Sequence, residues 1–168
     1  MRTMEGVLGL RIEATGKDSA VPAGCILISR HASLIDTLVP IRLLGPSGVN
    51  FRYILKTELL VDPAIDIIAH RFPNYFVDRS GADSAKELEQ ITALAAGTGP
   101  DEMFVIFPEG SRYTPAKKAR AMEKLSESNQ ALAEMAEGFT ITMPPLHGGT
   151  LAAINALPDG DVIVLAHT

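Results

Sequence analysis

Short apolar runs alternate with longer amphipathic stretches along the chain. Apolar runs bounded by turn residues are typical of buried strands, whereas apolar positions three or four apart are typical of helices. We expect strands at 7–14, 24–29, 51–56, 75–78, 103–107, 139–143 and 162–165, and helices at 33–44, 63–70, 83–96, 117–136 and 149–156. This alternation predicts an α/β fold, a single-domain sandwich with a largely parallel or mixed central sheet flanked by helices.

The size and composition of the chain suit one globular domain. Its 168 residues are 46% hydrophobic, enough for a substantial core, and no repeat or low-complexity tract divides them. The single Cys25 lies in an apolar run, so we expect it to be buried. No disulfide can form within the chain, which suits a reducing cytoplasm. No segment reaches the roughly 18 consecutive apolar residues of a membrane span, and the first residues lack the apolar core of a signal peptide.

The distribution of charge is more informative than its sum of −5. An acidic chain is not expected to bind nucleic acid, because neutralising its phosphates needs an extended basic face. All 15 Lys and Arg lie at or before Lys124, and between Arg30 and Lys56 the bases outnumber the single acid, Asp36. This local excess is compatible with a site for one or two phosphates, although solvated surface charge is the alternative.

The first candidate for chemistry is the segment His31-Ala32-Ser33-Leu34-Ile35-Asp36, which follows a predicted strand. Residues five apart on an α-helix are rotated by roughly 140° and do not share a face, so His31 must precede the helix. Ser33 and Asp36 match the Ser-x-x-acid capping pattern, with Ser33 as N-cap. A carboxylate beside one ring nitrogen leaves the other nitrogen of His31 as a general base. The alternative is a capping Asp36 and an ordinary loop histidine.

The second candidate is Phe107-Pro108-Glu109-Gly110-Ser111-Arg112, at the end of another predicted strand. Pro108 takes the chain out of the sheet, and Gly110 permits a close approach of the backbone to a ligand. Glu109 and Arg112 thereby reach the same rim, where the planar fork of arginine suits phosphate oxygens. A surface turn with a local ion pair is the alternative.

Other positions add weaker signals. Arg79 follows the strand predicted at 75–78 and is either a phosphate ligand or a solvated arginine. Gly148 and Gly149 follow a Pro-Pro pair and either expose N–H groups to an anion or form a structural turn. The remaining histidines show no metal-ligand spacing, so no metal is predicted; they are His70, His147 and His167. No Gly-x-Ser-x-Gly elbow is present, so His31 is expected to act on the substrate itself.

Taken in order, these motifs resemble those of the glycerolipid acyltransferase family, the 1-acyl-glycerol-3-phosphate and related lysophospholipid acyltransferases. The matching segments are His31-x4-Asp36, Phe76-x-x-Arg79, Phe107–Arg112 and Pro144-Pro145. The resemblance runs from about Leu10 to the last residue. The sequence departs from the family pattern in having Pro73 for a glycine, Ser111 for a threonine, Arg30 where asparagine is common, and a looser fourth block.

The resemblance implies transfer of a fatty acyl group from acyl-CoA or acyl-carrier protein to the hydroxyl of 1-acyl-glycerol-3-phosphate or a related lysophospholipid. It implies no cofactor and no metal. His31, oriented by Asp36, would deprotonate the acceptor hydroxyl. The implied substrate-binding residues are Arg79, Glu109, Gly110, Ser111 and Arg112, with the two arginines on the phosphate and Glu109 and the Gly110 backbone on the glycerol.

We further expect a peripheral protein on the cytoplasmic face of a membrane. Residues 1–168 would form one acyltransferase domain, truncated at its C-terminus and lacking the N-terminal membrane helices of many relatives. A glycerol-3-phosphate acyltransferase is the rival within the class, and a catalytically inert lipid-phosphate-binding domain is the rival outside it. A hydrolase is less favoured because neither an elbow nor a metal-type cluster accompanies His31 and Asp36.

Overall fold

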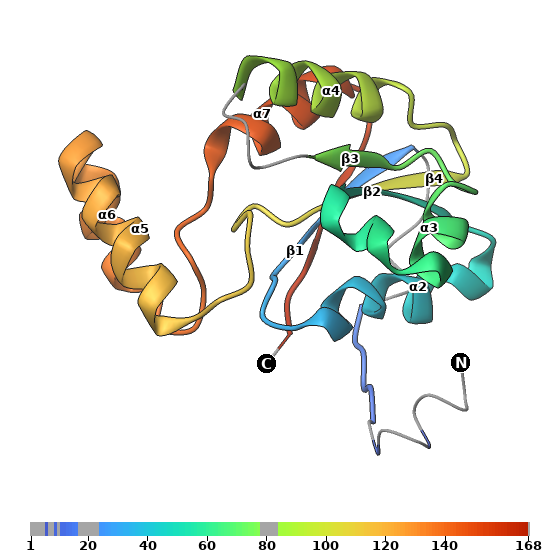
Figure 1. The fold of residues 1–168 in the computed structure, drawn as a ribbon, viewed down its shortest axis with the longest axis horizontal. Helices are drawn as coiled ribbons and strands as arrows, with labels where there is room; N and C mark the ends of the chain where they lie inside the picture. Colours follow the sequence, from blue (N-terminus) through green and yellow to red (C-terminus); the bar gives the residue numbers. More distant parts are fainter. Residues whose placement is uncertain (1–5, 7–8, 10, 17–23, 78–83, 168) are drawn as a thin grey trace.

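A five-stranded, entirely parallel sheet forms the centre of the computed structural model, which describes residues 6, 9, 11–16, 24–77 and 84–167 (Figure 1). The strand order is β3-β2-β4-β1-β5. The strands are β1 (Cys25–Ser29), β2 (Asn50–Lys56), β3 (Tyr75–Val77), β4 (Glu102–Ile106) and β5 (Val162–Leu165). The predicted α/β sandwich is therefore confirmed, and its sheet is parallel rather than mixed.

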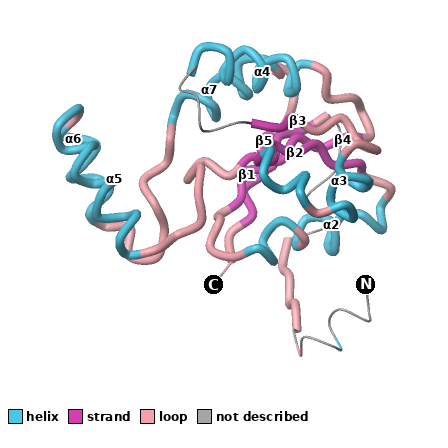
Figure 2. The backbone as a smooth tube through the Cα atoms, in the orientation of Figure 1, coloured by secondary structure: helices cyan, strands magenta, loops and turns pink. Residues whose placement is uncertain are grey.

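Helices occupy every connection between consecutive strands (Figure 2). The α-helices are α2 (Val39–Leu44), α3 (Pro63–Ala69), α4 (Ser84–Ala96), α5 (Pro115–Ser128), α6 (Gln130–Glu137) and α7 (His147–Ala156). In the part of the chain that the structure describes, three short 3-10 helices accompany them: η2 (Leu34–Thr37), η3 (Gly45–Ser47) and η4 (Thr57–Val61). Within the described residues, none of these helices has the length and apolarity needed to cross a membrane.

Each face of the sheet has its own apolar core, as expected for a parallel sheet covered on both sides. On one face, Leu44 of α2 and Phe51 pack with Cys25, which is fully buried as predicted. On the other face, Ile91 of α4 and Ala153 of α7 pack over residues of β1 and β4, which include Ile26, Phe104 and Ile106. Figure 1 shows α4 and α7 side by side on one side of the sheet and α2 on the other.

The connection between β4 and β5 is the longest in the described chain and carries three helices. Helices α5 and α6 pack against each other and extend away from the sheet as a separate arm (Figure 1). One helix was predicted over 117–136, but Asn129 divides it. The Asn129 backbone is extended, at φ −158° and ψ 95°, and its side chain accepts a hydrogen bond from the Leu132 amide as the N-cap of α6.

Two predicted strands are wrong where the structure describes them. Residues 11–14 form no strand, and the remainder of the prediction at 7–14 lies largely outside the described residues. Residues 139–143 alternate like a strand but form an irregular loop. Side chains, not a neighbouring strand, bind the backbone of this loop: Arg30 donates to the Ile141 carbonyl, and Glu109 accepts from the Met143 amide.

Candidate active site

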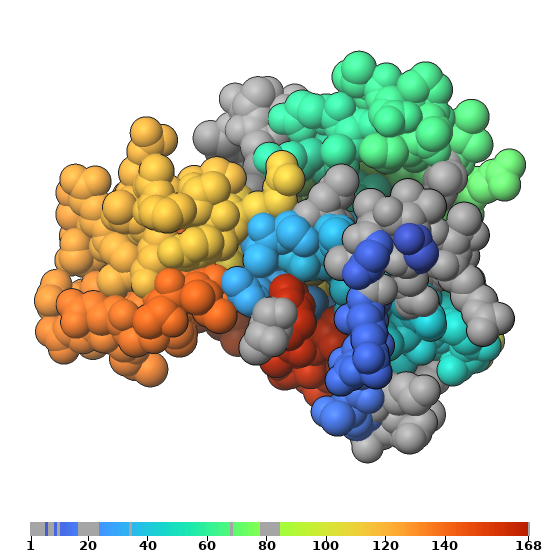
Figure 3. Space-filling view, turned by 90° about the horizontal axis from the view of Figure 1, so that it is seen from below, coloured from blue at the N-terminus to red at the C-terminus, as the bar shows by residue number. Residues whose placement is uncertain are grey.

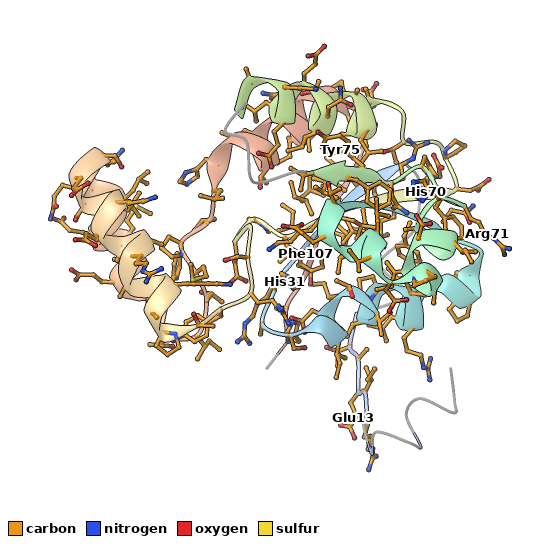
Figure 4. The ribbon with its side chains drawn as sticks, viewed as in Figure 1. Glu13, His31, His70, Arg71, Tyr75 and Phe107 are labelled. Carbon is orange, nitrogen blue, oxygen red and sulfur yellow. The ribbon has the colours of Figure 1, made fainter. Side chains whose placement is uncertain are left out.

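His31 lies in the turn that leaves the carboxyl end of β1, with its ring against Phe107 from the end of β4 (Figure 4). The two ring centroids are 4.5 Å apart. Because β1 and β4 are neighbouring parallel strands, their carboxyl ends meet at one edge of the sheet, where open α/β sheets place ligands. The two candidate motifs are therefore brought together, as their positions after strands predicted.

The predicted capping geometry of Asp36 is confirmed. Ser33 is the N-cap of η2, and both halves of the capping box are present. Asp36 is only 4% exposed, and its Oδ2 accepts hydrogen bonds from the amides of Ala32 and Ser33, both at 2.5 Å. The Ser33 hydroxyl donates to Oδ1 at 3.1 Å. The carboxylate is thus fixed by backbone and side chain before any ligand binds.

The imidazole of His31 faces this carboxylate. Its Nδ1 lies 3.8 Å from Asp36 Oδ2, within ion-pair range but longer than a hydrogen bond. Nδ1 is buried and has no hydrogen-bond partner. Distances of this kind are common before substrate binds, because such contacts tighten in the reacting complex. With Nδ1 directed at Asp36, Nε2 is the ring nitrogen left for a substrate.

Glu109 has a different position from the one its motif suggested. It is 8% exposed, and each carboxylate oxygen accepts a backbone hydrogen bond: Oε1 from the His31 amide at 2.7 Å, and Oε2 from the Met143 amide at 2.9 Å. Glu109 thereby ties the His31 turn to the loop that precedes α7. The geometry gives it a positioning role, and its predicted contact with substrate stays a prediction.

Burial controls the electrostatics of His31. Removal from water lowers the pKa of His31 below its ordinary value of 6.5, because burial penalises the charged ring. The Asp36 and Glu109 carboxylates oppose this shift, whereas the cations of Arg112 and Lys117 add to it. The net effect favours a neutral imidazole near pH 7, the form that accepts a proton.

A cleft of about 420 Å³ opens beside His31. Its apolar wall includes Leu55, Leu59, Leu88, Ile91 and Leu146. Three cationic residues, Lys56, Arg112 and Lys117, also line it. Apolar side chains and a group of cations in one cleft with a histidine suit a ligand that has both a hydrocarbon chain and a phosphate.

Helix α7 closes one side of the cleft with its first turn. Gly148 and Gly149 lie there, where amide groups lack partners within the helix, and Thr150 places a buried, unpartnered hydroxyl beside them. The glycines also have a packing role, because a Cβ on Gly149 would lie 3.1 Å from Ile91 of α4. Both interpretations from the sequence, anion binding and a structural role, are therefore compatible with the geometry.

The structure brings most, but not all, of the predicted site residues to the cleft or next to it. His31, Gly110, Ser111 and Arg112 line the cleft, while Asp36 and Glu109 lie behind His31. Arg79 lies outside the described residues. Within the described chain, no group of three His, Cys, Asp or Glu side chains is arranged to hold a metal ion.

The fold also brings to the site residues that lie outside the sequence motifs. Lys56 and Lys117 line the cleft, and His167 lies 3.4 Å from Asp36. Lys56 ends a predicted strand, so its position at the carboxyl edge of the sheet could be predicted from the sequence. Lys117 and His167 reach the site through the long β4–β5 connection and the final strand. No local pattern of the sequence indicates that these two side chains lie near His31 and Asp36.

Residues 11–147 match a family model described as Acyltransferase, which covers most of the chain, from the segment before β1 to the first residue of α7. Searches of curated proteins and of solved structures found no significant match. The chain belongs to the acyltransferase family, whose activity is the transfer of an acyl group.

Proposed function

We propose that the protein transfers a fatty acyl group from an acyl thioester to the free hydroxyl of 1-acyl-glycerol-3-phosphate or a related lysophospholipid. The observation that carries this proposal is the cleft, which His31 lines together with apolar side chains and the cations Lys56, Arg112 and Lys117. A lysophospholipid has matching parts, namely an acyl chain, a hydroxyl and a phosphate. The donor is acyl-CoA or acyl-carrier protein, and no cofactor is needed.

The proposed reaction is a direct transfer. His31 Nε2 takes the proton of the acceptor hydroxyl while the oxygen attacks the thioester carbonyl. A carbon–oxygen bond forms, the carbon–sulfur bond breaks, and the leaving thiolate takes the proton back from the imidazolium. Asp36, 3.8 Å from Nδ1, stabilises the imidazolium while it exists. Amide groups of Gly148 and Gly149 are suited to the developing oxyanion.

Contact with a membrane surface from the cytoplasmic side is part of this proposal. A lysophospholipid resides in a bilayer, so the cleft must open towards one. Leu146 lines the cleft and is 64% exposed, and Ile141 in the same loop is 51% exposed. Two cations contact the same loop, since Lys118 of α5 donates to the Phe139 carbonyl and Arg30 donates to the Ile141 carbonyl. Apolar side chains next to cations suit the interface of an anionic membrane.

The function is tested by incubating the purified chain with acyl-CoA and each of three acceptors: lysophosphatidate, glycerol-3-phosphate and monoacylglycerol. Free thiol and product lipid are measured together. We expect equal amounts of thiol and phosphatidate, with lysophosphatidate preferred. Preference for glycerol-3-phosphate would identify the other acceptor class. Thiol release without new lipid would indicate thioester hydrolysis, and binding of lysophosphatidate without turnover would indicate an inert lipid-phosphate-binding domain.

Substitution of Arg112 tests the phosphate part of the proposal. Arg112→Ala is expected to raise KM for lysophosphatidate by about three- to tenfold, with a smaller change in kcat, because an exposed cation contributes roughly 0.6–1.4 kcal/mol to binding of the phosphate. Arg120→Ala, an exposed arginine of α5 that does not line the cleft, is the matched control. An increase confined to KM for acyl-CoA would contradict the assignment. Arg79→Ala, by the resemblance, is expected to behave like Arg112→Ala.

The pH dependence tests the role of His31. A general base must be neutral, and burial lowers the pKa of His31, so activity is expected to fall only when the pH drops below the ordinary histidine value of 6.5. Lys117→Ala removes a cation that lowers this pKa, and it should move the acid limb of kcat/KM to higher pH. An acid limb above pH 6.5 in the wild type would argue against His31 as the base.

A further inference from the structure

His167, two residues beyond β5, contacts the opposite side of the Asp36 carboxylate from His31. Its Nε2 lies 3.4 Å from Asp36 Oδ1, whereas His31 faces Oδ2. Strand β5 pairs with β1 so that Leu165 is level with Ser29, which carries the segment after β5 to the His31 turn. Figure 3 shows the red C-terminal segment beside the light-blue residues that contain this turn.

The surroundings of His167 define which of its ring nitrogens carries a proton. Nε2 faces two acceptors, Asp36 Oδ1 and the Arg30 carbonyl oxygen, each at 3.4 Å. A ring nitrogen placed between two acceptor oxygens must carry a proton, because a lone pair there would be repelled by both. Arg30 also donates to the His167 carbonyl at 3.2 Å and so fixes its backbone. The proton on Nε2 therefore lies between the Arg30 carbonyl, its hydrogen-bond partner, and Asp36 Oδ1, which is within ion-pair range.

We propose that His167 is a positioning residue of the active site, which acts on His31 through Asp36: its Nε2–H holds Oδ1 and takes up part of the negative charge of the carboxylate. Two histidines then share one aspartate. The donor fixes the plane of the carboxylate and weakens its attraction for a proton on His31. His31 thus stays in the neutral form that the proposed function requires, and in this respect the inference rests on that function.

Other charges also act on His31, so the test must isolate His167. Asp36 and Glu109 carry negative charge towards the ring, and Arg112 and Lys117 carry positive charge. Arg30 is the cation beside His167. Substitution of His167 leaves all five in the chain and removes the ring contacts with Asp36 Oδ1 and the Arg30 carbonyl. Because Asp36 is the charged one of these two partners and lies 3.8 Å from His31 Nδ1, we expect a change in the titration of His31 to pass through Asp36.

The test is an NMR titration of the imidazole nitrogens in the full chain, which contains four histidines. In the wild type, His167 is expected to carry its proton on Nε2. In His167→Ala, the titration midpoint of His31 is expected to move to higher pH. In His167→Gln, whose amide can donate from nearly the same place, the His31 midpoint should return towards the wild-type value. His70→Ala, which removes an exposed histidine elsewhere, should leave the midpoint unchanged.

Kinetics supply a second measurement. The acid limb of kcat/KM should shift to higher pH in His167→Ala, with the plateau retained within about threefold, whereas a merely structural loss would lower the whole profile. The inference is overturned if the His31 midpoint is unchanged or lower in His167→Ala, if His167→Gln does not restore it, or if wild-type His167 is protonated only on Nδ1. If the wild type shows no acyl transfer but the titrations behave as expected, the proposed function fails and the coupling stands.

Discussion

Replacement of His31 by alanine is expected to lower kcat for acyl transfer by about 10²–10⁴-fold, the usual contribution of a general base. The reason is that His31 is the one histidine among the described residues that line the cleft. KM for the acceptor should change little, because the apolar wall and the cations remain. Steady-state assays of thiol release and product lipid, at saturating acyl-CoA, measure the effect.

The controls for His31→Ala separate chemistry from packing. The ring of His31 lies against Phe107, so its loss creates a small cavity, and circular dichroism with thermal unfolding must show that the fold persists. His31→Gln keeps more of the side-chain volume without a base and should be as inactive as alanine. His70→Ala, at an exposed position directly after α3, should retain wild-type activity. Substantial turnover by His31→Gln would exclude His31 as the base.

The position of His31 relative to Asp36 could be predicted because it depends on local backbone rules. A five-residue spacing excludes a shared helical face, and the Ser33–Asp36 capping box is a pattern of adjacent residues. Most strands were predicted for a similar reason, since buried parallel strands are short apolar runs bounded by turns. The meeting of the two motifs followed from parallel pairing, which places successive carboxyl ends at one edge.

What the sequence did not predict depends on contacts between distant residues. Glu109 binds amides 78 and 34 residues away in the chain, and nothing in its own turn shows that both oxygens are occupied. The segment 139–143 has a strand-like pattern, but the side chains of Arg30 and Glu109, not a neighbouring strand, bind its backbone. His167 reaches Asp36 only because β5 takes the edge position next to β1. These partners are set by tertiary packing, which local propensity does not encode.

Removal of Glu109 is expected to affect both stability and activity. Glu109→Ala leaves the amides of His31 and Met143 without their acceptor in a buried site, at a cost of about 2–5 kcal/mol in the free energy of unfolding. The His31 turn then loses one of its fixed points, and displacement of a catalytic group by about 1 Å can lower the rate by roughly 10²-fold. Urea unfolding and kcat, measured on the same preparation, should therefore fall together, while KM for the acceptor changes little.

Glu109→Gln and an exposed control distinguish this positioning role from the substrate contact that the motif suggested. The glutamine amide keeps one acceptor oxygen but turns a donor towards the second amide, so its loss of stability should lie between those of the wild type and Glu109→Ala. Glu127→Gln on the exposed surface of α5 should change nothing. If Glu109→Ala instead unfolds like the wild type and raises only KM for lysophosphatidate, Glu109 binds the substrate, and its hydrogen bonds to the two amides are not needed to hold His31 in place.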